Sequence, residues 1–450
     1  MQEIGVSSAI VCSPSARHSD SMQALPPRSA LLRNDFGRMW VCFALVHRSL
    51  LRAGVGHHGR LAQGDIQHED EGADVEAHSQ TGTRIKKRVI LVVSATALAV
   101  LGGASADAMA KKAGNYTRSP QHYSDAASDL ESQISGLGQS FDGDIGIAVQ
   151  DVQTGQVVEF DGRTFFPQQS VSKLWVALTA LDAADRGSTD LSDSVVLKKS
   201  DLTLFHQPIA RQIRAAGSYR TTLDALMTRA LQQSDNTCND FILRSIGGPD
   251  AVQAFLEAKD IEGVRFGPGE RKMQSRIAGL TWRQEYSIGN AFFRARANVP
   301  LGQRRAAFDA YVADPVDGAQ PVAIVSTLAR LQRGELLSAD STERLLETMS
   351  HTRTGPKRLK GGLSTGWSLA HKTGTGPQVG AMQTGYNDVG ILTSPNGRSY
   401  TVAVMIRRTS VPIWERMVVM QNVVRAVIEY DSKIGGRLLP PGSTTTARKR

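Results

Sequence analysis

The alternation of apolar and polar residues at both ends of the folded part of this chain most limits its fold. Such alternation, with a period of two, is typical of β-strands that have one face on a core. It occurs in residues 144–150, 156–160, 368–373, 386–393 and 400–407. The first two segments predict one hairpin, and Asn396-Gly397 predicts the turn of another. We therefore predict an α/β (α+β) fold with an antiparallel sheet built from both chain ends.

Helical spacing of apolar residues fills the space between and around these strands. Residues Tyr123–Leu137 and Pro412–Tyr430 predict helices that flank the sheet. An all-helical subdomain of about residues 174–335 is expected between the two parts of the α/β subdomain. Residues 263–290 carry glycine, proline and charge without a clear period, so they predict a long loop. Residues 291–312 predict one basic helix.

The N-terminal region has the features of a targeting segment in an unusual place. Residues 1–83 show no sustained apolar period and predict a non-globular extension. A basic cluster, an uncharged apolar run and small residues then follow, so residues 84–110 predict a secretory signal peptide. We expect the natural translation start near the basic cluster; the alternative is a cytoplasmic extension with an uncleaved membrane anchor. Residues 111–432 are then the catalytic domain, and residues 433–450 a flexible tail.

Composition and charge exclude several classes of function. The net charge is +9, yet the chain has no arginine-rich arm and no basic stripe interleaved with aromatic residues, so nucleic acid is not an expected partner. Of its cysteines, Cys12 and Cys42 precede the expected cleavage point, and only Cys238 remains. No internal disulfide or cysteine metal site is then expected, nor any cofactor or metal. Cys238 is interpreted as a small buried residue.

Three short motifs carry the chemistry. In Ser170-Val171-Ser172-Lys173, a helix that begins near Ser170 places the Lys173 amine beside the Ser170 hydroxyl, which helps a serine lose its proton as it attacks. Alone, Ser-x-x-Lys should occur by chance on the order of two times in a chain this long. Ser234-Asp235-Asn236 and Lys372-Thr373-Gly374 follow, each at the end of a predicted element, where side chains project into a cleft.

In this order, the motifs resemble those of class A serine β-lactamases and penicillin-binding proteins. His371-Lys372-Thr373-Gly374-Thr375-Gly376 and the stretch from Asn236 to Gly247-Gly248-Pro249 extend the resemblance, which covers residues 125–430. It implies a β-lactamase/transpeptidase-like fold and a serine hydrolase that acts on β-lactams through an acyl-enzyme.

The resemblance also implies roles for individual residues. Ser170 would be the nucleophile, and its backbone N–H and that of Thr375 would form the oxyanion hole. Ser234 would pass a proton to the leaving lactam nitrogen. The catalytic residues are then Ser170, Lys173, Ser234 and Glu270, and the substrate-binding residues are Asn236, Gln274, Lys372, Thr373, Gly374 and Thr375. Two ammonium groups in one cleft disfavour each other's charge, so Lys173 or Lys372 could act as a base; whether a lysine or a glutamate is the acylation base stays open.

The fate of the acyl-enzyme depends on a loop glutamate. Class A enzymes activate the hydrolytic water with a Glu in a Glu-x-x-Leu-Asn pattern, which Glu270, Met273 and Gln274 match with two substitutions. The alternative is that Glu270 is a solvated loop carboxylate. The family's loop-fixing ion pair looks absent, because Gly267-Pro268-Gly269 stands in its place.

Other departures concern the cleft edge. Extra residues between the second and third motifs fall around 282–320. Phe205 or His206 would supply the cleft-edge aromatic side chain, and Arg407 or Arg408 would compensate for an arginine that often helps to bind the substrate carboxylate.

We expect a secreted, monomeric enzyme of the bacterial periplasm, without a stable membrane anchor after signal cleavage, that gives resistance to β-lactam antibiotics. One alternative is a penicillin-interactive serine peptidase or esterase that deacylates slowly. Another is a non-catalytic relative that binds the cell wall.

Overall fold

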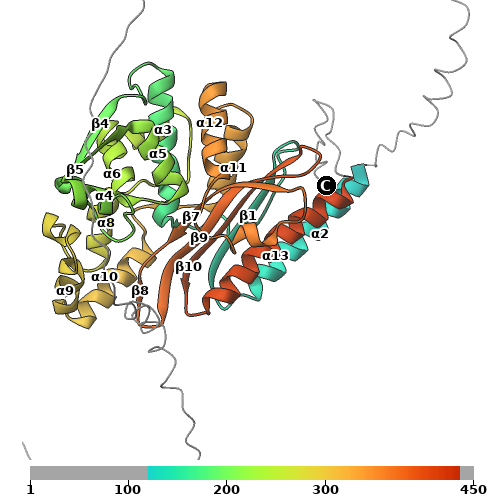
Figure 1. Cartoon of the computed structure of the whole chain (residues 1–450). Helices are drawn as coiled ribbons and strands as arrows, with labels where there is room; N and C mark the ends of the chain where they lie inside the picture. Colours follow the sequence, from blue (N-terminus) through green and yellow to red (C-terminus); the bar gives the residue numbers. More distant parts are fainter. Residues whose placement is uncertain (1–119, 436–450) are drawn as a thin grey trace, which may run out of the picture. The chain divides into compact units, whose positions relative to one another are not determined.

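The computed structural model describes residues 120–435 (Figure 1). The predicted extension, the predicted signal peptide and nearly all of the predicted tail lie outside these residues, so these three interpretations stay predictions. Within the described residues, no helix has both the length and the apolar character needed to cross a membrane.

A six-stranded antiparallel sheet forms the centre of the fold, in the order β2-β1-β10-β9-β7 with β8 paired to β9. Its two first strands come from the start of the described chain and the others from its end, which confirms the sheet predicted from both termini. The bounds are β1 Gly143–Asp151, β2 Val157–Phe160, β7 Ser368–Thr375, β8 Gln378–Val379, β9 Met382–Thr393 and β10 Ser399–Thr409.

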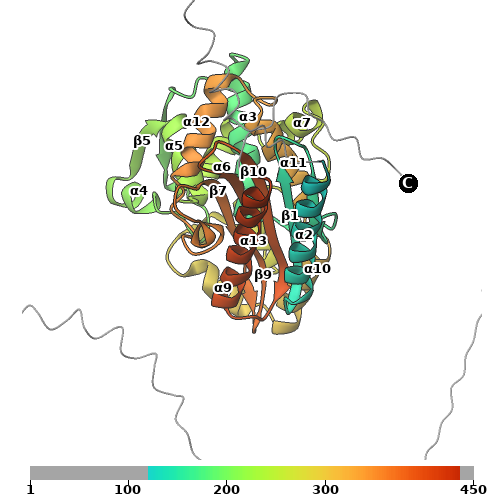
Figure 2. The same cartoon turned by 90° about the vertical axis from the view of Figure 1, so that its right-hand side faces the viewer.

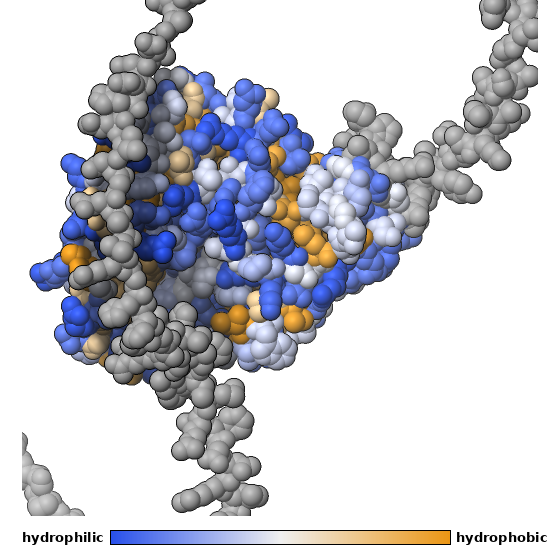
Figure 3. All heavy atoms as spheres, in the orientation of Figure 1, coloured by the Kyte–Doolittle hydropathy of each residue, from blue (hydrophilic) through white to orange (hydrophobic). Residues whose placement is uncertain are grey.

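Helices cover both faces of this sheet. Helices α2 (Pro120–Gln139) and α13 (Ile413–Lys433) lie side by side on one face (Figure 2), and α11 (Pro321–Gln332) packs against β1 and β10 on the other. The strand period decides which residues face which helices: Ile147 belongs to the core with α2 and α13, whereas its neighbour Ala148 belongs to the core on the other side. The face shown in Figure 3 is mostly hydrophilic, with apolar side chains in small scattered groups.

A largely helical subdomain packs beside the sheet around α3, which is buried along nearly its whole length. Its elements are η1 Gln169–Ser172, α3 Lys173–Asp185, η2 Lys199–Asp201, α4 Ala210–Ala216, α5 Leu223–Gln232, α6 Asn236–Ser245, α7 Pro249–Ala258 and α12 Ala339–Ser350. The turn η4 (Leu359–Gly362) packs on α13 instead, and its Leu359 belongs to the core with α2 and α13. The prediction of an all-helical subdomain is wrong at one place, because β4 (Ser194–Lys198) and β5 (Ser218–Thr222) pair as a separate two-stranded sheet. Most residues of these short strands are either exposed or half-buried, so their apolar residues show no clear alternation.

The long segment between residues 264 and 319 leaves the core and rejoins it at the place where it left. Its two ends meet there, because Val264 bridges Ala319. At the same place β6 (Gly318–Ala319) pairs with β3 (Phe166–Pro167). The predicted loop of residues 263–290 contains the helix α8 (Glu270–Ile277) and the short turn η3 (Gln284–Ser287).

The extra residues noted in the sequence form a pair of helices inside this segment. They are α9 (Ala291–Asn298) and α10 (Leu301–Ala313), not the single helix predicted for residues 291–312. The break falls at Pro300, which has no backbone N–H to continue a helix and disfavours helical backbone at the residue before it.

Candidate active site

The first motif forms a tight turn that opens a buried helix. Ser170 lies in η1, directly before α3, and Lys173 is the first residue of α3. The Lys173 Nζ donates to the Ser170 Oγ over 2.7 Å. The predicted placement of an amine beside this hydroxyl is therefore confirmed.

Lys173 joins three polar groups at the bottom of the site. Besides Ser170, its Nζ donates to the Oδ1 of Asn236 over 2.9 Å and to the Oε1 of Glu270. The Lys173 side chain is fully buried, and that of Glu270 is 3% exposed. An ammonium group has three N–H donors, so each one has an acceptor here.

The second and third motifs meet through Lys372. Its Nζ donates to the Ser234 Oγ over 2.9 Å and to the backbone carbonyl of Thr373 over the same distance. Burial, reinforced by the positive charge of Lys173, holds the pKa of Lys372 well below the usual range of a lysine. The expected repulsion between the two ammonium groups thus acts on Lys372.

Ser234 takes its place because the next residue caps a helix. The Asp235 carboxylate accepts from the backbone N–H groups of Thr237 and Cys238 at the start of α6, over 2.9 and 3.1 Å. Ser234 itself has a φ of 58°, a left-handed conformation that an ordinary residue adopts only when its surroundings hold it there. Asn236 follows, and its Nδ2 donates to the Leu204 carbonyl over 3.0 Å, which fixes the amide that faces Lys173.

Glu270 is the first residue of α8 and is buried rather than solvated. One turn later, the Nε2 of Gln274 donates to the Oε2 of Glu270 over 3.3 Å. The Asp240 carboxylate on α6 accepts from the backbone N–H of Glu270 over 2.9 Å and pairs with the Arg271 guanidinium. The ion pair that fixes this loop in class A enzymes is replaced here. The pair of Asp240 with Arg271 fixes the start of α8 in its place.

The residue before the nucleophile is tied to the end of the same long segment. Gln169 is buried and has a φ of 53°. Its backbone N–H donates to Asp317 over 2.7 Å, and its side chain contacts Tyr311 and accepts from Gln274 over 2.8 Å. Tyr311 in turn donates to Asp317 over 2.9 Å. These contacts hold the turn at Ser170 and the α8 segment in one arrangement.

Asp317 gives this network a dependence on pH. Burial, helped by the nearby charge of Glu270, raises the pKa of Asp317 from 3.8 to about 7. Because the folded pKa exceeds the unfolded one, the free energy of unfolding should fall as pH rises from about 4 to about 7, by at most about 4 kcal/mol. We expect the melting temperature of Asp317→Asn, relative to that of the parent, to rise by several degrees between pH 5 and pH 8. Thermal unfolding at both pH values tests this.

Asp309→Asn is the matched control, since Asp309 is exposed on α10 and the charge change is the same. A difference between Asp317→Asn and the parent that does not vary with pH would show that Asp317 does not titrate in this range.

The third motif supplies the other side of the site, together with an arginine that the sequence did not reveal. The Arg358 guanidinium donates to the Thr375 Oγ1 over 2.6 Å and to the carbonyl of Gly374 over 2.8 Å, and it lies over the Tyr386 ring at 3.9 Å. Thr373 accepts from or donates to Thr354 over 2.7 Å. A side chain at Gly374 would place its Cβ 2.3 Å from the Gln168 carbonyl, so only glycine lets β7 approach the turn at Ser170.

The predicted compensation by Arg407 or Arg408 is wrong. Arg407 pairs with Asp144 over 3.4 Å at the strand surface, Arg408 is exposed, and neither lines the cavity that contains Ser170. Both lie on β10, which is separated from the site by β9 and β7. Arg358 lines the cavity instead, because the loop before β7 folds back over that strand.

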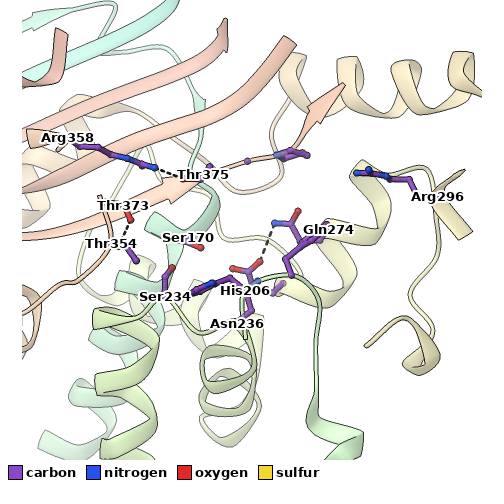
Figure 4. Close-up of a pocket in the computed structure, with 14 residues that line it drawn as sticks. Ser170, His206, Ser234, Asn236, Gln274, Arg296, Thr354, Arg358, Thr373 and Thr375 are labelled. Atoms are coloured by element: carbon purple, nitrogen blue, oxygen red, sulfur yellow. Dashed lines mark hydrogen bonds between the residues drawn. The ribbon is translucent and has the colours of Figure 1, made fainter. Parts of the chain in front are cut away.

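A cavity of about 410 Å³ joins these groups (Figure 4). Ser170 lies between Arg358, Thr373 and Thr375 on one side and Gln274 on the other. Ser234, Asn236 and Glu270 complete the wall near Ser170, and both predicted cleft-edge residues, Phe205 and His206, line its rim. Lys173, Lys372 and Gly374 lie behind this surface and contact the residues that form it.

Several residues of the site escaped sequence reasoning. Asp240 could have been found, because it lies one helical turn after Asn236 and so shares its face of α6. Arg358, Asp317 and Arg296 carry no such local signal, since each reaches the site only through the folding of a long connection.

Comparison with known proteins agrees with this geometry. A model of the β-lactamase enzyme family matches residues 129–430. The chain is 26% identical over 286 residues to the β-lactamase VEB-1 of Pseudomonas aeruginosa, which covers 63% of this chain and 84% of that protein. It is 26% identical to the β-lactamase CTX-M-8 of Citrobacter amalonaticus, over 62% of this chain and 80% of that protein.

Solved structures show the same fold. The TLA-1 extended-spectrum β-lactamase is 25% identical with a TM-score of 0.56, and the match covers 68% of this chain and 99% of that one. An ancestral class A β-lactamase is 27% identical with a TM-score of 0.52, over 67% of this chain and 99% of that one. With the three motifs assembled around one cavity, these matches show that the chain belongs to the class A serine β-lactamase family.

Proposed function

We propose that the protein is a secreted class A β-lactamase of the bacterial periplasm that gives resistance to β-lactam antibiotics. The lactam carbonyl is attacked by the Ser170 Oγ, whose proton passes to Lys173 acting as the base. The C–N bond of the lactam breaks as Ser234 passes its proton to the leaving nitrogen, and the proton held by Lys173 replaces the one that Ser234 gave. In deacylation, the Glu270 carboxylate takes a proton from a water that attacks the ester and passes it to the Ser170 Oγ as that oxygen leaves.

The observation that carries this proposal is the contact of the buried Glu270 carboxylate with both Lys173 and Gln274, beside Ser170. A solvated loop carboxylate would have neither contact. The Gln274 amide provides a donor on a longer side chain than the family's asparagine, and its bond to Gln169 holds it in place.

A chromogenic cephalosporin tests the proposal directly. We expect the mature protein to hydrolyse it, and Ser170→Ala to show no acyl adduct and no turnover, because only the oxygen of Ser170 can form the ester. Acylation of the parent without turnover would instead support a penicillin-interactive peptidase or esterase. No acylation of the parent at all would leave the non-catalytic, cell-wall-binding alternative.

Arg358 is proposed to help Thr373 and Thr375 hold the substrate carboxylate, with Lys372 behind them. In Arg358→Lys the charge remains but the planar fork of donors is lost, so we expect KM to rise by about tenfold with kcat changed by less than about threefold. Steady-state kinetics measure both values. Arg408→Ala, which removes an exposed arginine of β10, should change neither. A fall in kcat at constant KM would mean that Arg358 positions β7 rather than binds substrate.

A further inference from the structure

The inserted helices α9 and α10 form a second cavity next to the first. Its volume is about 230 Å³, and it shares Phe205, Gln274, Arg296 and Pro377 with the cavity that contains Ser170. Figure 4 shows Arg296 beyond Gln274, on the side of the site opposite Arg358. The shared residues make the second cavity a lateral extension of the substrate site.

Part of its wall is apolar and suited to a ring. Ile277 on α8, Phe292 on α9 and Leu301 on α10 line it, and Phe205 packs edge-to-face on Phe292 with ring centroids 5.1 Å apart. An apolar cavity of about 150 Å³ is enough to bind benzene. An aryl group with a substituent therefore fits the space between the inserted helices and the strand β8.

Two arginines of the inserted helices give this cavity its charge. Arg296 on α9 and Arg304 on α10 both line it, and both are half-buried. Within residues 120–435 neither is ion-paired to a carboxylate, and Arg296 lies over the Phe293 ring at 5.6 Å. An anion in the cavity would be the carboxylate partner that these half-buried guanidinium groups lack.

The direction of a bound substrate follows from the two ends of the site. The carboxylate on the fused ring of a β-lactam belongs near Arg358, Thr373 and Thr375, as proposed above. The acylamino side chain leaves the lactam ring on the opposite side, toward Gln274 and Arg296. We propose that the second cavity binds the acyl side chain and selects β-lactams whose side chain is aromatic and carries a carboxylate. This inference rests on the proposed function.

Benzylpenicillin and its α-carboxy derivative test this, because they differ by one carboxylate on the acyl side chain. We expect Arg296→Gln/Arg304→Gln to lower the ratio of kcat/KM for the α-carboxy compound to kcat/KM for benzylpenicillin by about tenfold or more. Arg294→Gln/Arg305→Gln is the matched control, since both residues are exposed on the same two helices and the net charge changes equally. It should affect the two substrates alike.

The outcomes separate this inference from the proposed function. Equal losses of kcat/KM on both penicillins would overturn the subsite, and so would the same selective loss in the control variant. In either case, turnover by the parent would still support a β-lactamase. If the parent turns over neither compound, the rates of acyl adduct formation at Ser170 are compared by intact mass spectrometry. A charge-dependent ratio would then support the subsite and contradict the proposed turnover, and the absence of any adduct would overturn both.

Discussion

In the Glu270→Gln variant, we expect kcat to fall by about 10³-fold while an acyl-enzyme accumulates on Ser170. The amide keeps an oxygen that can accept from Lys173, so the arrangement of the buried groups is largely retained. It cannot take a proton from water, so hydrolysis of the ester loses its base. Stopped-flow hydrolysis of a chromogenic cephalosporin should show a burst of one equivalent, and intact mass spectrometry should detect the stable adduct.

Glu285→Gln is the control, because Glu285 lies on the same long segment but is exposed and paired with Arg283. It should turn over like the parent. Unchanged turnover in Glu270→Gln would refute the assignment of the hydrolytic base, whereas loss of both burst and turnover would mean that Glu270 is needed for acylation first.

Replacement of Lys173 by methionine should have an equally large effect, on both activity and stability. Acylation loses the group that contacts the Ser170 Oγ, so we expect its rate to fall by about 10³-fold. The Glu270 carboxylate, 3% exposed, would lose its only ion-pair partner within the described residues. Removing one partner of a buried pair costs about 3–5 kcal/mol of the free energy of unfolding, because the other charge stays buried.

A double-mutant cycle separates the pair from its parts. Lys173→Met/Glu270→Gln should regain most of the stability lost in Lys173→Met, since no unpaired charge remains. Urea unfolding measures each corner of the cycle. Lys433→Met, which breaks solvent-accessible pairs with Glu429 and Asp129, should lower the midpoint far less than Lys173→Met. If Lys173→Met were as stable as the parent, Lys173 and Glu270 would not form a strongly coupled ion pair.

The parts of the site that sequence predicted are those set by local geometry. The turn of helix between Ser170 and Lys173 requires only that a helix begin there, and the turn between Glu270 and Gln274 follows from α8 in the same way. The sheet was predictable because apolar residues recur along its strands, although helices on both faces bury β1, β9 and β10 along most of their length. The short hairpin of β4 and β5 contributes little to the core and carries no such pattern.

The contacts between distant segments were not predictable in this way. Gln169 and Asp317 lie 148 residues apart in the sequence, and Arg358 reaches Thr375 across a connection without regular period. The pattern of polar residues along the sequence does not indicate which of the chain's many arginines folds back over β7. Arg407 or Arg408 was predicted to compensate for the family's missing arginine, but both lie on a strand that does not border the site.

The sequence by itself determined the three motifs, their order and the antiparallel sheet that brings them together, because each depends on residue type and short periodicity. Only the tertiary structure decided that Glu270 is buried against Lys173, that Asp240 and Asp317 hold its segment, and that α9 and α10 enlarge the site. Burial and charge pairing are properties of neighbours in space, so a lone glutamate in a glycine-rich stretch acquires its chemistry only when the fold removes water from around it.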